Sequence, residues 1–352
     1  MKIPRSLLGA LVAATSVVLV VLTVQWLDRP PSPEPLVLAV SKSKLGLPFW
    51  VAEGQGFFTA EGLAVTLERR PTGKRALDAM LAGQAEVATV AETPIMFAAL
   101  AGVPLRVIAN YAASDEQSVV ARADLGIHQV TDLAGRRVGV SRGTTAHYFL
   151  HVLLSDQGLS ESAVELVDLP APEQAAALAA GRVAAVSTFA PYSTECRRAL
   201  GDRAQSFPSG SRYRGYANLV TTPDFLHRRP EAVLRLLRAT ARAILWMRTH
   251  RQEAIALAAE LSNSEIAVVE ETWDWLRPNL ALDQAFVILL QSEARWAIGQ
   301  GLAPGAVPLD FPALIDAAPL ARLYPEAITL IPFPSPHPKP PPEAGRESAG
   351  RP

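Results

Sequence analysis

The stretch 137–147, which reads RVGVSRGTTAH, combines residue types that suit anion binding. A buried strand is expected to end before Ser141, a glycine-containing turn follows, and a helix is expected to begin near Thr144 or Thr145. Free backbone N–H groups and the positive end of the helix dipole then meet beside three hydroxyls. This pattern predicts a site for a carboxylate, sulfonate, nitrate or phosphate group. The alternative is structural, with Thr144 capping the helix and Gly143 making the turn.

The same stretch contains Gly139-x-Ser141-x-Gly143, which matches the nucleophile elbow of α/β-hydrolases. A hydrolase of that type also needs an acid and then a histidine, each after a later strand, to activate the serine. None of the later histidines follows an expected strand, and no HGGG-like oxyanion segment precedes the motif. A serine esterase acting through Ser141 is therefore the weaker alternative, and the turn is interpreted as a binding element.

Two histidines, His147 and His151, are spaced to share one face of the helix that follows the turn. Zinc ligands can have this spacing, but the local pattern offers no acidic third ligand. We expect no metal at this place. His147, in the first turn of the helix, is expected to contact the ligand, whereas His151 is expected to be packed or solvated.

Further candidate ligand contacts follow three other expected strands, because open α/β sheets bind ligands beyond the carboxyl ends of their strands. They are Ser41, Ser43, Glu92, Thr93, Phe189 and Tyr192. Glu92 has two interpretations: an acid favoured by the dipole at a helix start, or a pocket carboxylate that meets a ligand amine. Phe189 could wall an apolar cleft or belong to the ordinary core.

Short apolar runs typical of buried strands alternate with helical patterns along the body of the chain. Strands are expected at 36–40, 65–67, 86–90, 105–109, 137–140, 164–169 and 183–186, and helices around 49–58, 74–82, 94–101, 144–157 and 172–180. Gly83, Gly102, Gly158 and Gly181 are placed as helix stops. This alternation indicates an α/β fold with mostly parallel sheets. From Pro230 onward only helical periods are found, which predicts a helical cap without strands.

The composition excludes several classes of function. The 352 residues carry 33 basic and 34 acidic side chains, so the chain has no positive surplus for binding a nucleic acid. Its one cysteine, Cys196, permits neither an internal disulfide nor a cysteine-bound metal or iron–sulfur cluster. No cofactor is expected.

The two ends of the chain differ from its body. Lys2 and Arg5 precede an uncharged apolar run at 7–24, which is long enough to cross a membrane with the rest of the protein outside the cytoplasm. Residues 1–27 are therefore expected to be a signal-anchor or signal segment, followed by a proline-rich spacer at 28–35. The proline-rich tail at 332–352 is expected to be disordered.

Several segments, in their order and spacing, resemble the substrate-binding proteins of ABC importers of the nitrate, sulfonate and taurine type, a family related to thiamine-pyrimidine synthesis proteins. The matching segments are Gly46–Glu53, Gly56–Phe58, Glu61–Leu63, Gly83–Pro94, Asp132–Val140, Gly143–Tyr148, Pro223–Leu226 and Pro230–Ala232.

The resemblance implies an α/β, two-lobed type II periplasmic-binding fold with a helical C-terminal cap. Lobe I would comprise 36–115 plus 222–331 and lobe II would comprise 116–221, with crossings near 112–118 and 220–223. It also implies an anion site at Ser141 to Thr145, including Gly143. Further contacts are implied from the loops at 41–48, which include Leu47, at 91–93 and at 189–192.

By the same resemblance, the protein would be a monomer on the outer side of the cytoplasmic membrane. It would capture a small anionic or zwitterionic solute and deliver it to ABC permease and ATPase subunits, without catalysis. The alternative is an anchored sensory module with the same fold. The chain reads Gly181-Arg-Val-Ala-Ala185 and Phe189-Ala-Pro191 where the family often has Gly-x-x-Asp-Ala and Trp-x-Pro, so the ligand's identity stays open. The pyrimidine-synthesis branch is disfavoured because it uses a cysteine-rich segment, whereas this chain has one cysteine, Cys196.

Overall fold

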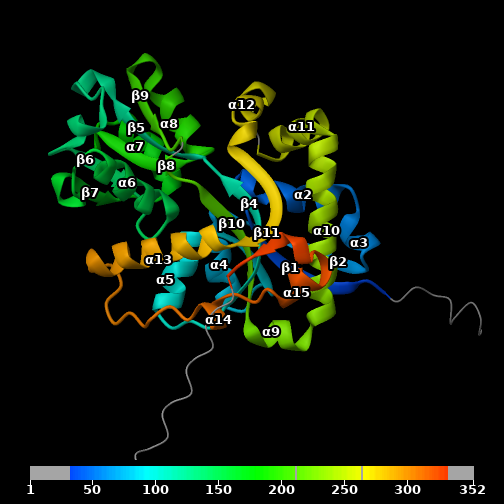
Figure 1. Ribbon diagram of the computed structural model, residues 1–352. Coiled ribbons are helices and arrows are strands. Elements are labelled where there is room, and N and C mark those ends of the chain that lie inside the picture. Colours follow the sequence, from blue (N-terminus) through cyan, green and yellow to red (C-terminus); the bar gives the residue numbers. More distant parts are fainter. Residues whose placement is uncertain (1–31, 211, 263–264, 332–352) are drawn as a thin grey trace, which may run out of the picture.

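The computed structural model describes residues 32–210, 212–262 and 265–331, which form two β-sheets, each flanked by helices (Figure 1). The larger sheet has seven strands in the order β12-β11-β4-β10-β3-β1-β2. Their bounds are Ile328–Thr329, Leu276–Asp283, Arg106–Ser114, Gly215–Thr221, Val87–Ala91, Glu34–Ser41 and Leu63–Arg70. We call this sheet with its helices lobe I. Strand β1 begins inside the expected spacer, because Glu34 and Pro35 pair with Leu63 and Ala64 of β2.

The smaller sheet, with its helices, forms lobe II. Its five strands have the order β7-β6-β8-β5-β9. Their bounds are Glu165–Asp168, Arg137–Val140, Ala185–Phe189, Gln117–Arg122 and Ala204–Pro208. Both sheets are mixed: β1 pairs parallel with β2 and β3, whereas β10 runs antiparallel to β3 and β4, and β5 runs antiparallel to β8 and β9. The expectation of mostly parallel sheets was wrong, because the strands next to the interlobe crossings reverse direction.

The helices of the first part of the chain lie close to their expected positions. They are α2 (Leu47–Gly54), α4 (Gly73–Leu81), α5 (Glu92–Leu100), α6 (Thr145–Asp156) and α7 (Gln174–Ala179). The one helix expected at 49–58 is divided into α2 and α3 (Phe57–Ala60), and α8 (Tyr192–Leu200) and α9 (Pro223–Arg228) were not expected. Gly83, Gly102, Gly158 and Gly181 follow helices and have positive φ, as expected of helix stops.

The C-terminal part is mainly helical but not free of strands. Its helices are α10 (Pro230–Thr249), α11 (Arg251–Ser262), α12 (Ile266–Glu271), α13 (Gln284–Gly299), α14 (Phe311–Leu314) and α15 (Ala318–Leu323). The expected cap without strands was wrong, because β11 and β12 extend the sheet of lobe I beyond β4. The sequence of β11, LRPNLALD, contains a proline and polar residues and alternates weakly, so it lacks the apolar run of a buried strand.

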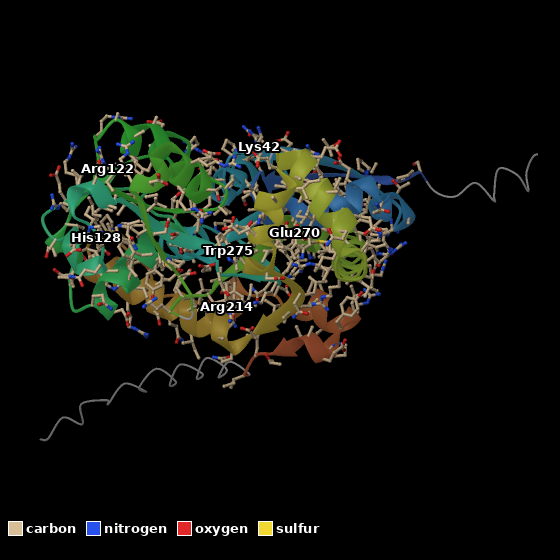
Figure 2. The ribbon with its side chains drawn as sticks, turned by 90° about the horizontal axis from the view of Figure 1, so that it is seen from above. Lys42, Arg122, His128, Arg214, Glu270 and Trp275 are labelled. Atoms are coloured by element: carbon tan, nitrogen blue, oxygen red, sulfur yellow. The ribbon has the colours of Figure 1, made fainter. Side chains whose placement is uncertain are left out.

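The chain crosses between the lobes twice. The first crossing joins β4 to β5, within the segment expected at 112–118, and the second joins β9 to β10. Because β10 pairs with β3 and β4, the boundary expected between residues 221 and 222 falls one strand too late. The backbone N–H of Asp115 donates to Trp275 O at 2.9 Å, and its carboxylate accepts from Arg214 and Arg277. Figure 2 shows Arg214 and Trp275 near this junction.

None of the described helices has the length and apolarity that a membrane crossing requires. The expected anchor at 7–24 and the tail at 332–352 lie outside the described residues.

A fully buried aromatic pair joins α2 to the sheet of lobe I. The Phe49 ring lies edge-on to the Tyr111 ring of β4, with 4.9 Å between centroids, and Tyr111 Oη donates to Leu45 O at 2.9 Å. Both side chains have no exposed surface. The pair therefore fixes the loop after β1, which carries Ser41 and Ser43, against the sheet.

We expect Phe49→Ala to lower the free energy of unfolding by about 3–5 kcal/mol, because it removes a buried ring and leaves a cavity. Urea unfolding followed by circular dichroism measures the change. Leu245→Ala is the control, because Leu245 lies on α10 with 61% of its surface exposed and should cost less than about 1 kcal/mol. Equal losses for both variants would contradict this assignment.

Candidate functional site

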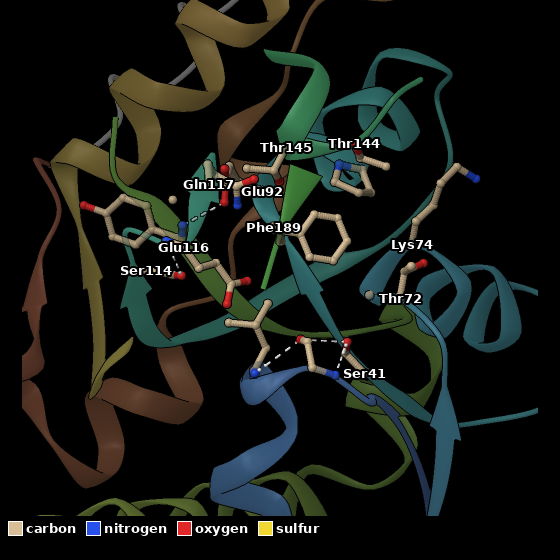
Figure 3. Close-up of a pocket in the computed structure, with 17 residues that line it drawn as sticks. Ser41, Thr72, Lys74, Glu92, Ser114, Glu116, Gln117, Thr144, Thr145 and Phe189 are labelled. Carbon is tan, nitrogen blue, oxygen red and sulfur yellow. Dashed lines mark hydrogen bonds between the residues drawn. The ribbon is translucent and has the colours of Figure 1, made fainter. Parts of the chain in front are cut away.

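A cavity of about 50 Å³ lies between the two lobes (Figure 3). It is bordered by the ends of strands β1, β3 and β8, the first turns of α4, α5 and α6, and both crossing segments. The lining residues are Ser41, Ser43, Leu45, Thr72, Gly73, Lys74, Ala91, Glu92, Pro94, Ser114, Glu116, Gln117, Thr144, Thr145, Phe189, Gly215 and Tyr216. Carboxyl ends of strands thus face helix N-termini, as is typical of ligand sites in α/β folds.

The cavity brings together six of the residues predicted as ligand contacts: Ser41, Ser43, Glu92, Thr144, Thr145 and Phe189. The two serines form a local network, with 2.9 Å between their Oγ atoms, and Ser43 Oγ accepts the Leu45 N–H as a helix cap. Thr144 occupies the N-cap position of α6, but its hydroxyl donates back to Ser141 O at 2.6 Å and caps no N–H of the helix. The alternative that the Thr144 side chain only caps the helix is therefore not supported.

The other six predicted residues do not line this cavity. Leu47 is buried at the start of α2, and Ser141 and Gly143 lie in the turn before α6, where Gly143 has φ +70°. Thr93 is buried behind Glu92, and its hydroxyl donates to Glu293 Oε1 of α13 at 2.6 Å. Tyr192 Oη donates to Pro71 O across the cleft at 3.3 Å. The remaining residue is His147.

His147 is fully buried against α13 and the loop before β7. Its Nε2 lies 3.5 Å from Glu161 Oε2, and its ring stands edge-on to Trp296. His151 Nδ1 lies 3.3 Å from Glu161 Oε1. Burial opposes ionisation of Glu161, but hydrogen bonds from both histidines and Trp296 lower its pKa to about 2. The structure thus supplies an acidic neighbour that the local sequence lacked. Even so, the described residues contain no group of three such side chains that could hold a metal.

The hydrolase alternative gains no support from the geometry around Ser141. No hydrogen bond within the described part of the chain joins its hydroxyl to a histidine, and the nearby His147 faces Glu161 instead. His147 Nδ1 accepts the Gly143 N–H at 3.5 Å. The pairing of nucleophile and base that defines such an enzyme is therefore not formed in this arrangement.

Glu92 is fully buried and already hydrogen-bonded. The Tyr213 hydroxyl of the second crossing donates to its Oε1, and the Tyr216 N–H of β10 donates to its Oε2 at 2.7 Å. Burial raises the pKa of Glu92, and these hydrogen bonds oppose the rise. Its neighbour Glu293 has a pKa raised well above the ordinary range by burial and by repulsion from Glu92. Glu92 therefore ties the second crossing to the start of α5.

The sequence analysis missed Glu116, which lies in the first crossing and enters the cavity. Glu116 is 4% exposed, and none of the described residues forms a hydrogen bond or ion pair with its carboxylate. Burial raises its pKa to about 8, against an opposing effect of Lys44 and with a contribution from Glu92. Burial likewise lowers the pKa of Lys44 to about 8. The only signal in the sequence was the position of Glu116 within the expected crossing.

Lys74, which was not among the predicted site residues, lines the cavity at the first turn of α4. Its Nζ lies 3.2 Å from Asp78 on the next turn, and Thr72 caps the helix by accepting the Arg75 N–H. The starts of α4 and α6 therefore present positive dipole ends to the cavity, and Lys74 lines it while its Nζ contacts Asp78. In the sequence, Lys74 lies in a basic stretch with Arg69, Arg70 and Arg75, and nothing local distinguishes it from its exposed neighbour Arg75.

Comparison with known proteins places these observations in a family. The family model described as NMT1/THI5 like matches residues 46–254, more than half of the chain. A putative aliphatic sulfonates-binding protein of Bacillus subtilis is 26% identical over 63% of this chain and 69% of its own length.

Two solved structures share the fold. The alkanesulfonate-binding protein SsuA from Xanthomonas axonopodis pv. citri, bound to MOPS, has a TM-score of 0.71 at 21% identity, covering 82% of this chain and all of its own. The desulfurization enzyme DSZB has a TM-score of 0.60 at 19% identity, covering 82% of this chain and 98% of its own. The fold alone therefore accommodates both binding and catalysis, whereas the family match over most of both lobes shows that this chain belongs to the NMT1/THI5-like family.

Proposed function

We propose that this protein is the extracytoplasmic solute-binding component of an ABC importer and captures a small anionic or zwitterionic solute, with sulfonates as the leading class. The observation that carries the proposal is the cavity between the two lobes, which is lined by helix starts and by Lys74. The sulfonate-binding relative and the two-lobed fold support it. The protein acts by binding, without catalysis.

The anionic group of the solute lies at the starts of α4 and α6. Backbone N–H groups in the first turn of a helix lack intrahelical partners, so they can donate to an anion. Lys74, whose Nζ also contacts Asp78, lines the cavity beside them, and Thr144 and Thr145 complete that wall. The start of α5 contributes less to anion binding because Glu92 occupies its first turn.

Contacts across the cleft hold the lobes in a closed arrangement. Trp296 Nε1 of α13 donates to Glu161 Oε1 of lobe II at 2.5 Å, and Thr93 Oγ1 lies 3.4 Å from Thr145 Oγ1. Arg197 and Arg198 of α8 pair with Glu271 and Glu265 beside α12. A ligand that favours this arrangement shifts the population towards it, and the permease would select the closed form.

The remaining partners follow from this role. The closed protein docks as a monomer on the permease, whose ATPase subunits drive uptake. The apolar segment 7–24 would hold the protein at the outer side of the cytoplasmic membrane, with residues 28–33 as a spacer. This arrangement keeps the binding protein close to its permease and raises its effective concentration there.

We expect the purified protein to bind small alkanesulfonates, and Lys74→Met to weaken that binding by about 10- to 100-fold, as for the loss of a hydrogen bond to a charged group. Isothermal titration calorimetry measures the change. Arg75→Met is the matched control, because Arg75 is the next residue on α4, also lies near Asp78 and does not line the cavity. No heat of binding from any sulfonate would contradict the proposed function, and equal losses in both variants would remove Lys74 from the site.

We expect Trp296→Phe to weaken ligand binding by about tenfold while the ligand contacts stay intact, because the closed state loses the hydrogen bond to the charged Glu161. Calorimetry gives the affinity, and small-angle X-ray scattering should show a larger radius of gyration without ligand.

Trp246→Phe is the control for this change, because Trp246 stacks on His250 at 4.9 Å and lies on α10, outside the interface between the lobes. If Trp296→Phe bound ligand as well as the control did, the Trp296 contact would have no part in closure.

A further inference from the structure

Glu116 is an unusual side chain for a site expected to hold an anion. Its carboxylate is almost completely removed from water, and its Oε2 has no hydrogen-bond donor among the described residues. A buried polar group without a partner costs roughly 1–3 kcal/mol, and more when it is charged. Such a group in a cavity is accounted for if a ligand supplies the missing donor.

The other carboxylate in the cavity cannot take this role. Glu92 already accepts from Tyr213 Oη and from the Tyr216 N–H, so both of its oxygens are engaged within the protein. A ligand amine would have to compete with these buried hydrogen bonds. Of the two carboxylates, Glu116 is therefore the one whose Oε2 is free to accept a hydrogen bond.

The surroundings of Glu116 also favour a hydrogen-bond donor. Gln117, the next residue, lines the same cavity and has a buried Oε1 without a partner. Glu116 Oε2 and Gln117 Oε1 are the two buried polar atoms among the described lining residues that lack a hydrogen bond, and both are acceptors. In Figure 3 the Glu116 and Lys74 side chains lie on opposite sides of the Phe189 ring. The cavity therefore separates an acidic side from a basic side.

We propose that Glu116 receives a protonated amine of the solute, with Gln117 beside it, so that the solute is an amino-substituted anion whose acidic group lies at Lys74 and the starts of α4 and α6. This inference rests on the proposed binding function and narrows its substrate class. The Phe189 ring packs against the short apolar part that joins the two charged groups.

Other charged groups near Glu116 affect the pKa of its carboxyl group. Lys44, beside α2, attracts the Glu116 carboxylate but forms no ion pair with it. The Lys44 Nζ instead donates to Val269 O at 3.4 Å and is also attracted by Glu271. Glu92, at the start of α5, repels the Glu116 carboxylate. The ammonium group of a bound ligand adds the direct partner that the distant Lys44 does not provide.

The test uses two matched ligand pairs on the whole protein. Taurine and propane-1-sulfonate have similar size, but only taurine carries an amine; β-alanine and butyrate form the equivalent carboxylate pair. By calorimetry, we expect the wild type to bind taurine at least about tenfold more tightly than propane-1-sulfonate. Glu116→Gln should remove this preference, because a neutral amide cannot form an ion pair with the ammonium group of taurine. Glu92→Gln should weaken both sulfonates alike, because Glu92 holds the fold of the site.

The outcomes separate this inference from the proposed function. If both sulfonates bound with equal affinity in wild type and Glu116→Gln, sulfonate binding would stand and the role of Glu116 would be overturned. If neither sulfonate bound but β-alanine bound more tightly than butyrate in a manner dependent on Glu116, the amine site would stand and the sulfonate class would be wrong. Failure of all four ligands to bind would overturn both.

A second measurement needs no ligand. The folded protein raises the pKa of Glu116 from 4.5 to about 8. The contribution of Glu116 to the free energy of unfolding is therefore fully present below pH 4.5 and is lost as the pH rises through 8. Glu116→Gln removes this loss, so its melting temperature should exceed that of the wild type by a margin that grows from pH 5 to pH 9. A variant that melts at or below the wild-type temperature at pH 9 would show that the carboxylate already has a partner and would overturn the inference.

Discussion

A carboxylate removed from water between two lobes must be hydrogen-bonded, and the way Glu92 meets this requirement organises the centre of the molecule. Its two oxygens accept from Tyr213 and from the backbone of Tyr216. These donors belong to the second crossing and to β10, so the acid at the start of α5 determines where the chain re-enters lobe I. Gly215 lies between them, and a Cβ there would approach Glu92 Oε1 to 3.2 Å. The close approach of backbone and carboxylate thus depends on a residue without a side chain.

The interface between the lobes is built from similar buried polar contacts. On the lobe I side, burial and repulsion from Glu92 raise the pKa of Glu293 of α13 well above its ordinary range, and Glu293 accepts from Thr93. Further out, Glu161 stays ionised because His147, His151 and Trp296 surround it. The surroundings thus raise the pKa of Glu293 and lower that of Glu161. The Trp296–Glu161 hydrogen bond joins α13 to lobe II, and the Thr93–Thr145 contact joins α5 to α6, so separating the lobes would break both.

The cavity combines two opposite electrostatic demands within a small space. Helix starts and Lys74 favour an anion, whereas the unpartnered Glu116 favours a cation. A net charge of −1 over the whole chain gives no long-range preference for either sign. Selection must therefore come from groups in direct contact with the solute, and a solute that carries both charges satisfies both sides of the cavity.

The sequence by itself determined the local elements and the general place of the site. Apolar runs such as 36–40 and glycine stops such as Gly83 depend on neighbouring residues, so they could be recognised without the fold. The strand ends likewise predicted that Ser41, Glu92 and Thr144 would lie together. Only the tertiary structure decided that β10 belongs to lobe I, because strand pairing joins segments far apart in the chain.

The tertiary structure also decided which of two acids has a free carboxylate. Glu92 and Glu116 look equally available in the sequence, since nothing local to Glu92 reveals the Tyr213 hydroxyl that occupies it. Lys74 lines the cavity whereas its neighbour Arg75 does not, and only the placement of α4 at the cleft decides this. Burial and hydrogen bonding between distant segments set these properties, and neither is encoded in a local pattern.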